Sequence, residues 1–162
     1  MIVVLLALLA AILFSACSSS ADAPRASDFT LMTLEGDSVS LSDFSGKVVL
    51  VNFFATYCPP CRAEIPDFIK LQEHFGSEDY VTIGISVDQR PEKILPGFIK
   101  VLKISYPVLL ANRKVLTDYG NVYALPTTFL LDREHRIVKK YTGMVTEDQL
   151  RPLIAKALNR KD

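Results

Sequence analysis

Cys58 and Cys61 are the residues of this chain best suited to chemistry, and two prolines separate them. They lie where an apolar run, Val48 to Ala55, gives way to a helical pattern that begins near Pro59. Side chains three positions apart on a helix are neighbours, with about 5–6 Å between their Cβ atoms, which a small adjustment brings to disulfide geometry. A disulfide across so short a loop adds little stability. The spacing therefore predicts a redox-active pair, in which the disulfide between Cys58 and Cys61 forms and breaks.

The start of a helix makes the two sulfurs unequal. Backbone N–H groups without partners and the helix dipole stabilise negative charge there, so a thiolate on Cys58 should have a lowered pKa. We expect Cys58 to attack and Cys61, one turn further in, to resolve the mixed disulfide. Pro59 and Pro60 fit this position because a helix tolerates proline in its first turn.

Two other interpretations of the cysteine pair remain open. One is structural zinc, since His74 follows Cys61 after twelve residues, a spacing seen in zinc fingers. No fourth ligand is evident: residues 78–80 are Glu, Asp and Tyr, and His135 is the other histidine. The second is a permanent disulfide, which would stabilise the fold little. We expect no metal.

The length and composition of the chain indicate one globular domain with a tail. The chain has 162 residues, 49% of them hydrophobic, with 18 basic and 18 acidic side chains. There is no basic surplus, no block rich in lysine or arginine and no basic stretch with interleaved aromatics. Nucleic acid is therefore excluded as an expected partner.

The N-terminus has the features of an export signal. Residues 2–14 are uniformly apolar, fewer than the roughly 20 needed to span a bilayer. Ser15 and Ala16 before Cys17 resemble the lipobox of bacterial lipoproteins, in which cleavage leaves the cysteine as a lipid-modified N-terminus. We expect a signal peptide at 1–16, a flexible tether at 17–26 and the folded domain at 27–162. An uncleaved anchor or a plain secretory signal is the alternative.

Lipidation of Cys17 would also account for the odd number of cysteines. The chain has three, so a lipid on one leaves the 58/61 pair. Either kind of signal places the domain outside the cytoplasm, where disulfide chemistry is sustained.

The patterns of the domain alternate between strand and helix. Residues 29–34 and 39–41 flank a Gly-containing turn and predict a small β-hairpin. Further strands are expected at 47–55, 81–87, 107–110, 127–131 and 136–142, and helices at 59–75, with a kink at Pro66, at 91–103, at 114–119 and after Thr146. Thr146 and Gln149 form a capping-box pattern. The order indicates βαβ units around a mixed sheet.

Three stretches resemble one family: Gly46 to Pro66, Leu125 to Phe129, and Thr142-Gly143. They are similar in motif, order and spacing to the TlpA/ResA-like thioredoxin-family envelope thiol-disulfide oxidoreductases, over about residues 27–160. The resemblance implies an α/β thioredoxin-like fold, with a central mixed β-sheet flanked by helices and an N-terminal β-hairpin extension. Phe54 and Tyr57 stand where the family usually has Trp.

The resemblance also implies roles for residues away from the cysteines. Pro126 aligns with the cis-proline that faces the cysteine pair and helps hold a substrate strand. Asn52 takes the place of the buried Asp of ordinary thioredoxins, and an amide cannot titrate. Glu64 resembles the acidic residue that this subgroup carries after its cysteines, and partial burial would raise its pKa into a useful range for acid–base work; a solvated first-turn Glu is the alternative.

The remaining candidate residues would form the substrate surface. We expect Tyr57, Phe54 and Leu125 to make an apolar rim around the sulfurs, together with Pro59 and Pro60. His74 and His135 are expected at the surface, since neither has another candidate ligand or base beside it in the sequence.

The function implied is an envelope enzyme of thiol-disulfide exchange. The family resemblance suggests that it reduces disulfides in client proteins, with apocytochromes c as one possible client class, and that a membrane thiol donor reduces it in turn. We expect a lipid-anchored monomer without a cofactor, facing the periplasm or extracytoplasmic space.

Two other classes are weighed against it. A peroxiredoxin-like thiol peroxidase would carry Pro and Thr where this chain has Val51 and Ala55. A Sco-like copper-binding module separates its cysteines by three residues and adds a distal histidine. In this chain two residues separate the cysteines, and neither Sco feature is evident.

Overall fold

The computed structural model describes residues 23–159, so the expected signal peptide, Cys17 and the start of the expected tether lie outside the described residues. The elements follow in the order β1 (Thr30–Met32), β2 (Ser38–Ser40), η2 (Leu41–Phe44), β3 (Val48–Phe54), α2 (Pro59–Phe75), β4 (Tyr80–Ser86), α3 (Pro91–Leu102), β5 (Val108–Leu110), α4 (Arg113–Asp118), β6 (Thr127–Leu131), β7 (Ile137–Thr142) and α5 (Glu147–Leu158). This is the expected thioredoxin-like α/β fold with an N-terminal hairpin. The sequence did not predict the 3₁₀ helix η2.

A five-stranded sheet forms the centre, in the order β5-β4-β3-β6-β7. β3 pairs in parallel with β4, which pairs in parallel with β5, whereas β6 and β7 run antiparallel to their neighbours. β1 and β2 form the separate antiparallel hairpin. In the register, Phe54 pairs with Ser86, so the carboxyl ends of β3 and β4 lie side by side.

Both faces of the central strand are covered, and all seven residues of β3 are buried. Successive side chains of a strand point to opposite faces, and the two sets join different cores. Val48, Leu50 and Phe54 pack with α2, α3 and α5, and Val49, Val51 and Phe53 pack with the hairpin, η2 and α4. Such double coverage explains the unbroken apolar run seen in the sequence.

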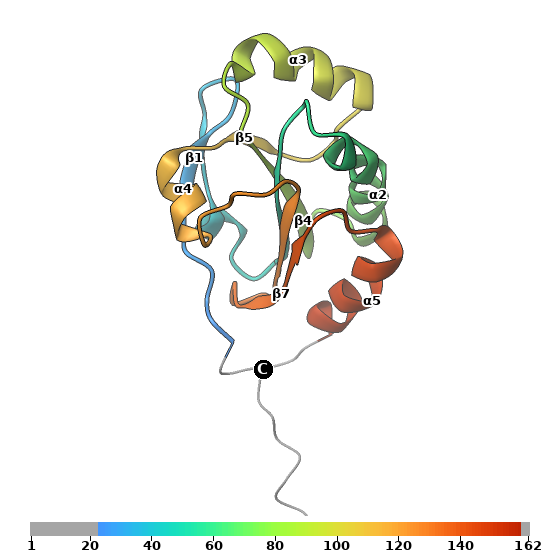
Figure 1. Ribbon diagram of the computed structural model, residues 1–162. Helices are drawn as coiled ribbons and strands as arrows, with labels where there is room; N and C mark the ends of the chain where they lie inside the picture. The colour runs from blue at the N-terminus through green and yellow to red at the C-terminus, as the bar shows by residue number, and fades with distance from the viewer. Residues whose placement is uncertain (1–22, 160–162) are drawn as a thin grey trace, which may run out of the picture.

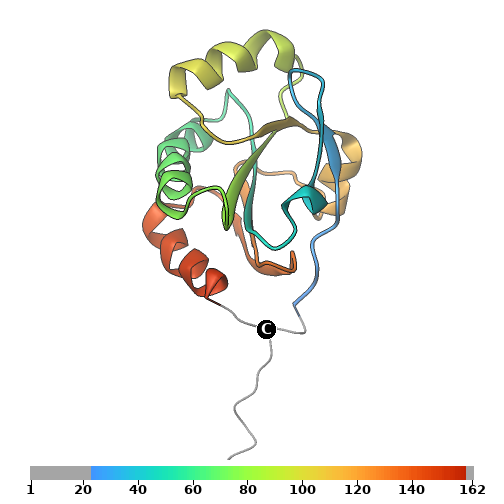
Figure 2. The ribbon, with the colours of Figure 1, turned by 180° about the vertical axis from the view of Figure 1, so that it is seen from behind.

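Two helices cover one side of the sheet together. α2 and α5 lie next to each other in both views (Figures 1 and 2), and their residues are in contact. α2 continues through Pro66. The predicted capping box of α5 is confirmed, with Thr146 as the N-cap and Gln149 as the third helical residue. Among residues 23–159, no helix is long and apolar enough to cross a membrane.

The chain enters the fold along the edge strand β7. Ile137 N donates to Pro24 O at 2.9 Å, and Ala26 N donates to His135 O at 2.8 Å. These bonds lie near the turn between β6 and β7, and the sheet register places that turn beside the start of β3.

The expected surface position of His135 is wrong. The residue is 9% exposed and has a positive φ of 58°, and its Nε2 lies 3.2 Å from Phe44 O. The turn between β6 and β7 therefore folds back against η2 and buries the ring. His74 is exposed, as expected.

Candidate active site

Cys58 and Cys61 form a disulfide, with an S–S distance of 2.06 Å and 5.3 Å between the Cα atoms. Cys58 is the N-cap of α2, and Pro59 and Pro60 are the first two helical residues. Cys58 retains 7% exposure, whereas Cys61 is fully buried. Cys58 is therefore the less buried of the two cysteines.

The helix start also provides a donor for that sulfur. Cys61 N donates to Cys58 Sγ at 3.3 Å, which is the bond that an N-cap side chain makes to the N3 amide. Once the disulfide is reduced, the same N–H and the helix dipole favour a thiolate on Cys58. The geometry supports the predicted asymmetry between the two cysteines.

Glu64 is buried one turn beyond Cys61, with 1% exposure. Asn52 Nδ2 donates to its Oε1 at 2.8 Å, and Val145 N donates to its Oε2 at 3.2 Å. Burial raises the pKa of Glu64 to about 7, and the hydrogen bonds from Val145 and Asn52 offset this rise only in part. A carboxyl group with such a pKa can release and take up a proton near neutral pH. Glu64 is buried, as expected, and is not a solvated residue of the first turn.

Asn52 links Glu64 to the neighbouring strand β6. Besides the bond to Glu64, its Nδ2 donates to Thr128 Oγ1 at 2.9 Å. Tyr106 lies on the same side of the sheet; burial, and then the charge of Glu64, raise its pKa above the usual range. Gly84 makes room here, because a Cβ at that position would come within 3.1 Å of Phe54 and 3.3 Å of Tyr106.

The Leu125–Pro126 peptide bond is cis, as the resemblance implies. Pro126 is buried, and its carbonyl oxygen accepts from Gly143 N at 2.8 Å. The next residue, Thr127, pairs with Phe53 in the sheet. The register therefore places Pro126 at the carboxyl end of β3, the end from which the chain continues to Cys58.

The expected rim residues divide into two groups. Tyr57 is 71% exposed, Pro59 and Pro60 are exposed, and Leu125 is half-buried, so these four are available to a client protein. Phe54 is 2% exposed and stacks on Phe98 in the core. The expectation that Phe54 forms part of the rim is therefore wrong, because it is the last β3 residue on the face that α3 covers.

The structure adds two exposed side chains that the sequence did not single out. Met144 is 53% exposed and lies between Gly143, which binds Pro126, and Val145, which binds Glu64. Tyr123 is 90% exposed in the loop that leads to the cis-proline. Only their exposure marks them, since an isolated Met or Tyr carries no sequence signal of function.

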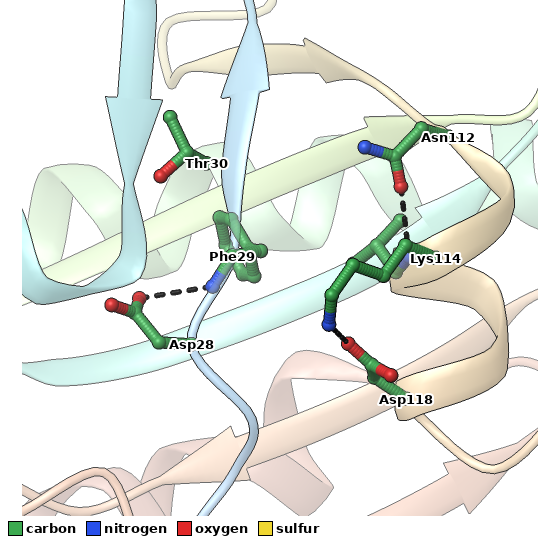
Figure 3. A pocket seen from close by; sticks show the side chains of 7 residues that line it. Asp28, Phe29, Thr30, Asn112, Lys114 and Asp118 are labelled. Carbon is green, nitrogen blue, oxygen red and sulfur yellow. Dashed lines mark hydrogen bonds and ion pairs between the residues drawn. The ribbon is translucent and has the colours of Figure 1, made fainter.

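A separate pocket of about 340 Å³ lies between the start of β1 and α4 (Figure 3). Its lining comprises Asp28, Phe29, Thr30, Asn112, Lys114, Val115 and Asp118, and it contains neither cysteine. The polar groups there serve the fold: Asn112 caps α4 through Val115 N, and Lys114 pairs with Asp118. Among residues 23–159, no group of three His, Cys, Asp or Glu side chains is arranged to hold a metal ion.

Comparison with known proteins agrees with this geometry. Residues 23–140 match the model of the AhpC/TSA family. The thioredoxin-like protein YneN of Bacillus subtilis (strain 168) is 35% identical over 127 residues, which are 78% of this chain and 74% of that protein. The thiol-disulfide oxidoreductase ResA of the same strain is 34% identical over 133 residues, covering 82% of this chain and 72% of ResA.

A solved structure extends the similarity to three dimensions. The thiol:disulfide interchange protein of the thioredoxin family from Chlorobium tepidum TLS has a TM-score of 0.77 and 30% sequence identity, covering 87% of this chain and all of that chain (100%).

Proposed function

The chain belongs to the AhpC/TSA family and is a thiol-disulfide oxidoreductase, and from this we propose that Cys58 and Cys61 exchange electrons with disulfide-containing client proteins outside the cytoplasm. The observation that carries the proposal is the Cys58–Cys61 disulfide at the N-terminus of α2. The less buried cysteine at the helix start, the fully buried cysteine one turn on and a buried carboxyl group with a pKa of about 7 support the proposal.

The reduced enzyme would act in two displacements. The Cys58 thiolate attacks one sulfur of the client disulfide, the second client sulfur leaves as a thiolate, and a mixed disulfide forms. Cys61 then loses its proton and attacks Cys58 Sγ, which closes the Cys58–Cys61 bond and releases the client as a dithiol. Glu64 is the proposed acceptor of the Cys61 proton, since it lies on the same helix one turn away. Two electrons pass to the client, and its two departing thiolates take up two protons: one is the Cys61 proton that Glu64 has accepted and can pass on, and the other comes from solvent.

We propose that this exchange runs in the reducing direction, with apocytochromes c as one client class and a membrane thiol donor that restores the dithiol. The reduction potential of the 58/61 pair tests the direction. A value near that of thioredoxin, about −270 mV, is the expected result, whereas a value near that of DsbA, about −120 mV, would make the protein an oxidant. The measurement equilibrates the domain with dithiothreitol or glutathione buffers and counts free thiols.

The same protein preparation distinguishes disulfide reduction from the alternative, thiol peroxidase activity. A thiol peroxidase would consume hydrogen peroxide with the reduced pair as electron donor, whereas the proposed enzyme reduces a protein disulfide such as that of insulin. Absence of any reversible two-electron transition would contradict both.

We also propose that Cys17 carries a lipid and holds the domain at a membrane. The lipobox-like residues before it and the odd number of cysteines support the proposal. Replacing Cys17 with Ser is expected to move the protein from the membrane fraction to the soluble fraction and to abolish incorporation of labelled fatty acid. Unchanged labelling of the variant would contradict the assignment.

A further inference from the structure

Three residues, Ala55 to Tyr57, connect β3 to the disulfide, and one of them is held by a buried carboxylate. β3 ends at Phe54, and Cys58 N closes a turn by donating to Ala55 O at 3.1 Å. Thr56 and Tyr57 are the middle residues of that turn, so their conformation fixes the position at which Cys58 enters α2. Tyr57 is exposed and has little protein around it to hold it.

Thr56 is held instead by Asp88, two residues beyond the end of the neighbouring strand β4. Its backbone N donates to both carboxylate oxygens, at 3.1 Å to Oδ2 and 3.3 Å to Oδ1, and its hydroxyl donates to Oδ1 at 2.7 Å. Ser86 Oγ donates to Oδ2 at 2.8 Å and accepts from Asp88 N at 3.2 Å. Asp88 is 9% exposed, and hydrogen bonds to a carboxylate are stronger than those between neutral groups.

The sheet explains why Asp88 can reach Thr56. We call the hydrogen bonds between these two residues the Asp88 clamp. Phe54 and Ser86 are paired at the carboxyl ends of β3 and β4, and Val87 N donates to Phe54 O at 2.9 Å. Asp88 is the next residue along, directly opposite the turn that leads to Cys58. The turn that leads to Cys58 is thus hydrogen-bonded to the segment that directly follows β4.

We infer that Asp88 is a positioning residue for thiol-disulfide exchange: by holding Thr56 it keeps Cys58 at the N-cap of α2, where Cys61 N faces the sulfur. The inference rests on the attacking role proposed for Cys58. Positioning and charge act in opposite directions here. Any effect of the Asp88 charge on the sulfur disfavours a thiolate by like-charge repulsion, whereas the hydrogen bonds to Thr56 favour the thiolate by keeping its amide donor in place.

The test measures the Cys58 pKa of the reduced protein from the pH dependence of alkylation, in wild type and in the Asp88→Ala variant. Loss of the clamp is expected to raise that pKa by about one unit. At a pH below both pKa values the thiolate fraction then falls about tenfold, and the greater nucleophilicity of the more basic thiolate leaves a net loss in rate of about threefold.

Two further variants make the result decisive. Thr56→Val keeps the carboxylate but removes the hydroxyl donor, and is expected to raise the Cys58 pKa by a smaller amount in the same direction; it also serves if Asp88→Ala does not fold. Asp28→Asn is the matched control, because Asp28 similarly accepts from the backbone N–H groups of Phe29 and Ser42, at 2.9 and 3.2 Å, beside the hairpin. It is expected to change thermal stability alone.

Two results would overturn the inference. A lower Cys58 pKa in Asp88→Ala would show that charge, not position, is the contribution of Asp88. An unchanged pKa with a lower melting temperature would show a role in stability alone. Failure of wild-type protein to exchange disulfides would instead refute the proposed function, so the two failures are distinguishable.

Discussion

Replacing Cys58 with Ser is expected to lower the rate of client disulfide reduction by at least about a thousandfold, because a serine hydroxyl is not ionised at neutral pH and cannot form a disulfide. Cys58 is the less buried of the two cysteines, and the Cys61 N–H donates to its sulfur. The reduction of insulin or of another protein disulfide measures the loss, and circular dichroism confirms that the variant is folded.

Replacing Cys61 with Ser is expected to have a different consequence. Cys58 can still attack, but the buried sulfur that would release the client is absent, so the mixed disulfide should accumulate. Non-reducing electrophoresis and mass spectrometry detect the adduct, and the same variant captures clients from envelope extracts. Mixed disulfides on Cys61 in the Cys58→Ser protein, with none in Cys61→Ser, would reverse the two roles.

The second large effect concerns Glu64 and the pH dependence of stability. The pKa of Glu64 is raised from 4.5 in the unfolded reference to about 7 in the fold, so between these pH values the native state holds a proton that the unfolded chain has lost. The contribution of Glu64 to the free energy of unfolding therefore falls as the pH rises from 4.5 to 7, by up to about 3 kcal/mol.

Urea unfolding of the oxidised protein at several pH values measures this contribution. Glu64→Gln is expected to lose the dependence, and Glu73→Gln, an exposed position on the same helix, is the matched control. In exchange assays Glu64→Gln should also lower the rate by about a hundredfold and remove the step near pH 7 from the pH profile. Identical pH profiles for Glu64→Gln and wild type would exclude Glu64 from proton transfer.

Much of the fold could be predicted from the sequence because its signals are local. The apolar run at Val48–Phe54 and the helical spacing of Pro59–Phe75 predict β3 and α2, since strand and helix bury side chains with different periods. The capping box of Thr146 marks the start of α5 for a similar reason. The turn that buries His135 against Phe44 was not predicted, because it depends on packing between segments 91 residues apart.

Spacing alone could predict the site only where its residues are neighbours in sequence, whereas the cis bond at Pro126 was predicted through the family resemblance. Cys58, Cys61 and Glu64 share one helix, so spacing alone places them together. The bond from Asn52 to Thr128 spans 76 residues and the bond from Thr56 to Asp88 spans 32. The strand order brings these pairs together, and residue types do not reveal it. The strand pattern likewise could not tell that α3 covers Phe54.

The route by which the chain enters the fold places its first described residues and its disulfide at opposite ends of β3. Pro24 and Ala26 bind the turn beside the start of β3, and the disulfide follows the other end of that strand. The seven residues of β3, at about 3.3 Å each, separate these two ends by about 20 Å. In Figure 1 the first described residues and the end of α5 lie at the bottom, away from α3 at the top. A partner that meets the disulfide would therefore approach the end of the sheet opposite the one at which Pro24 enters the fold.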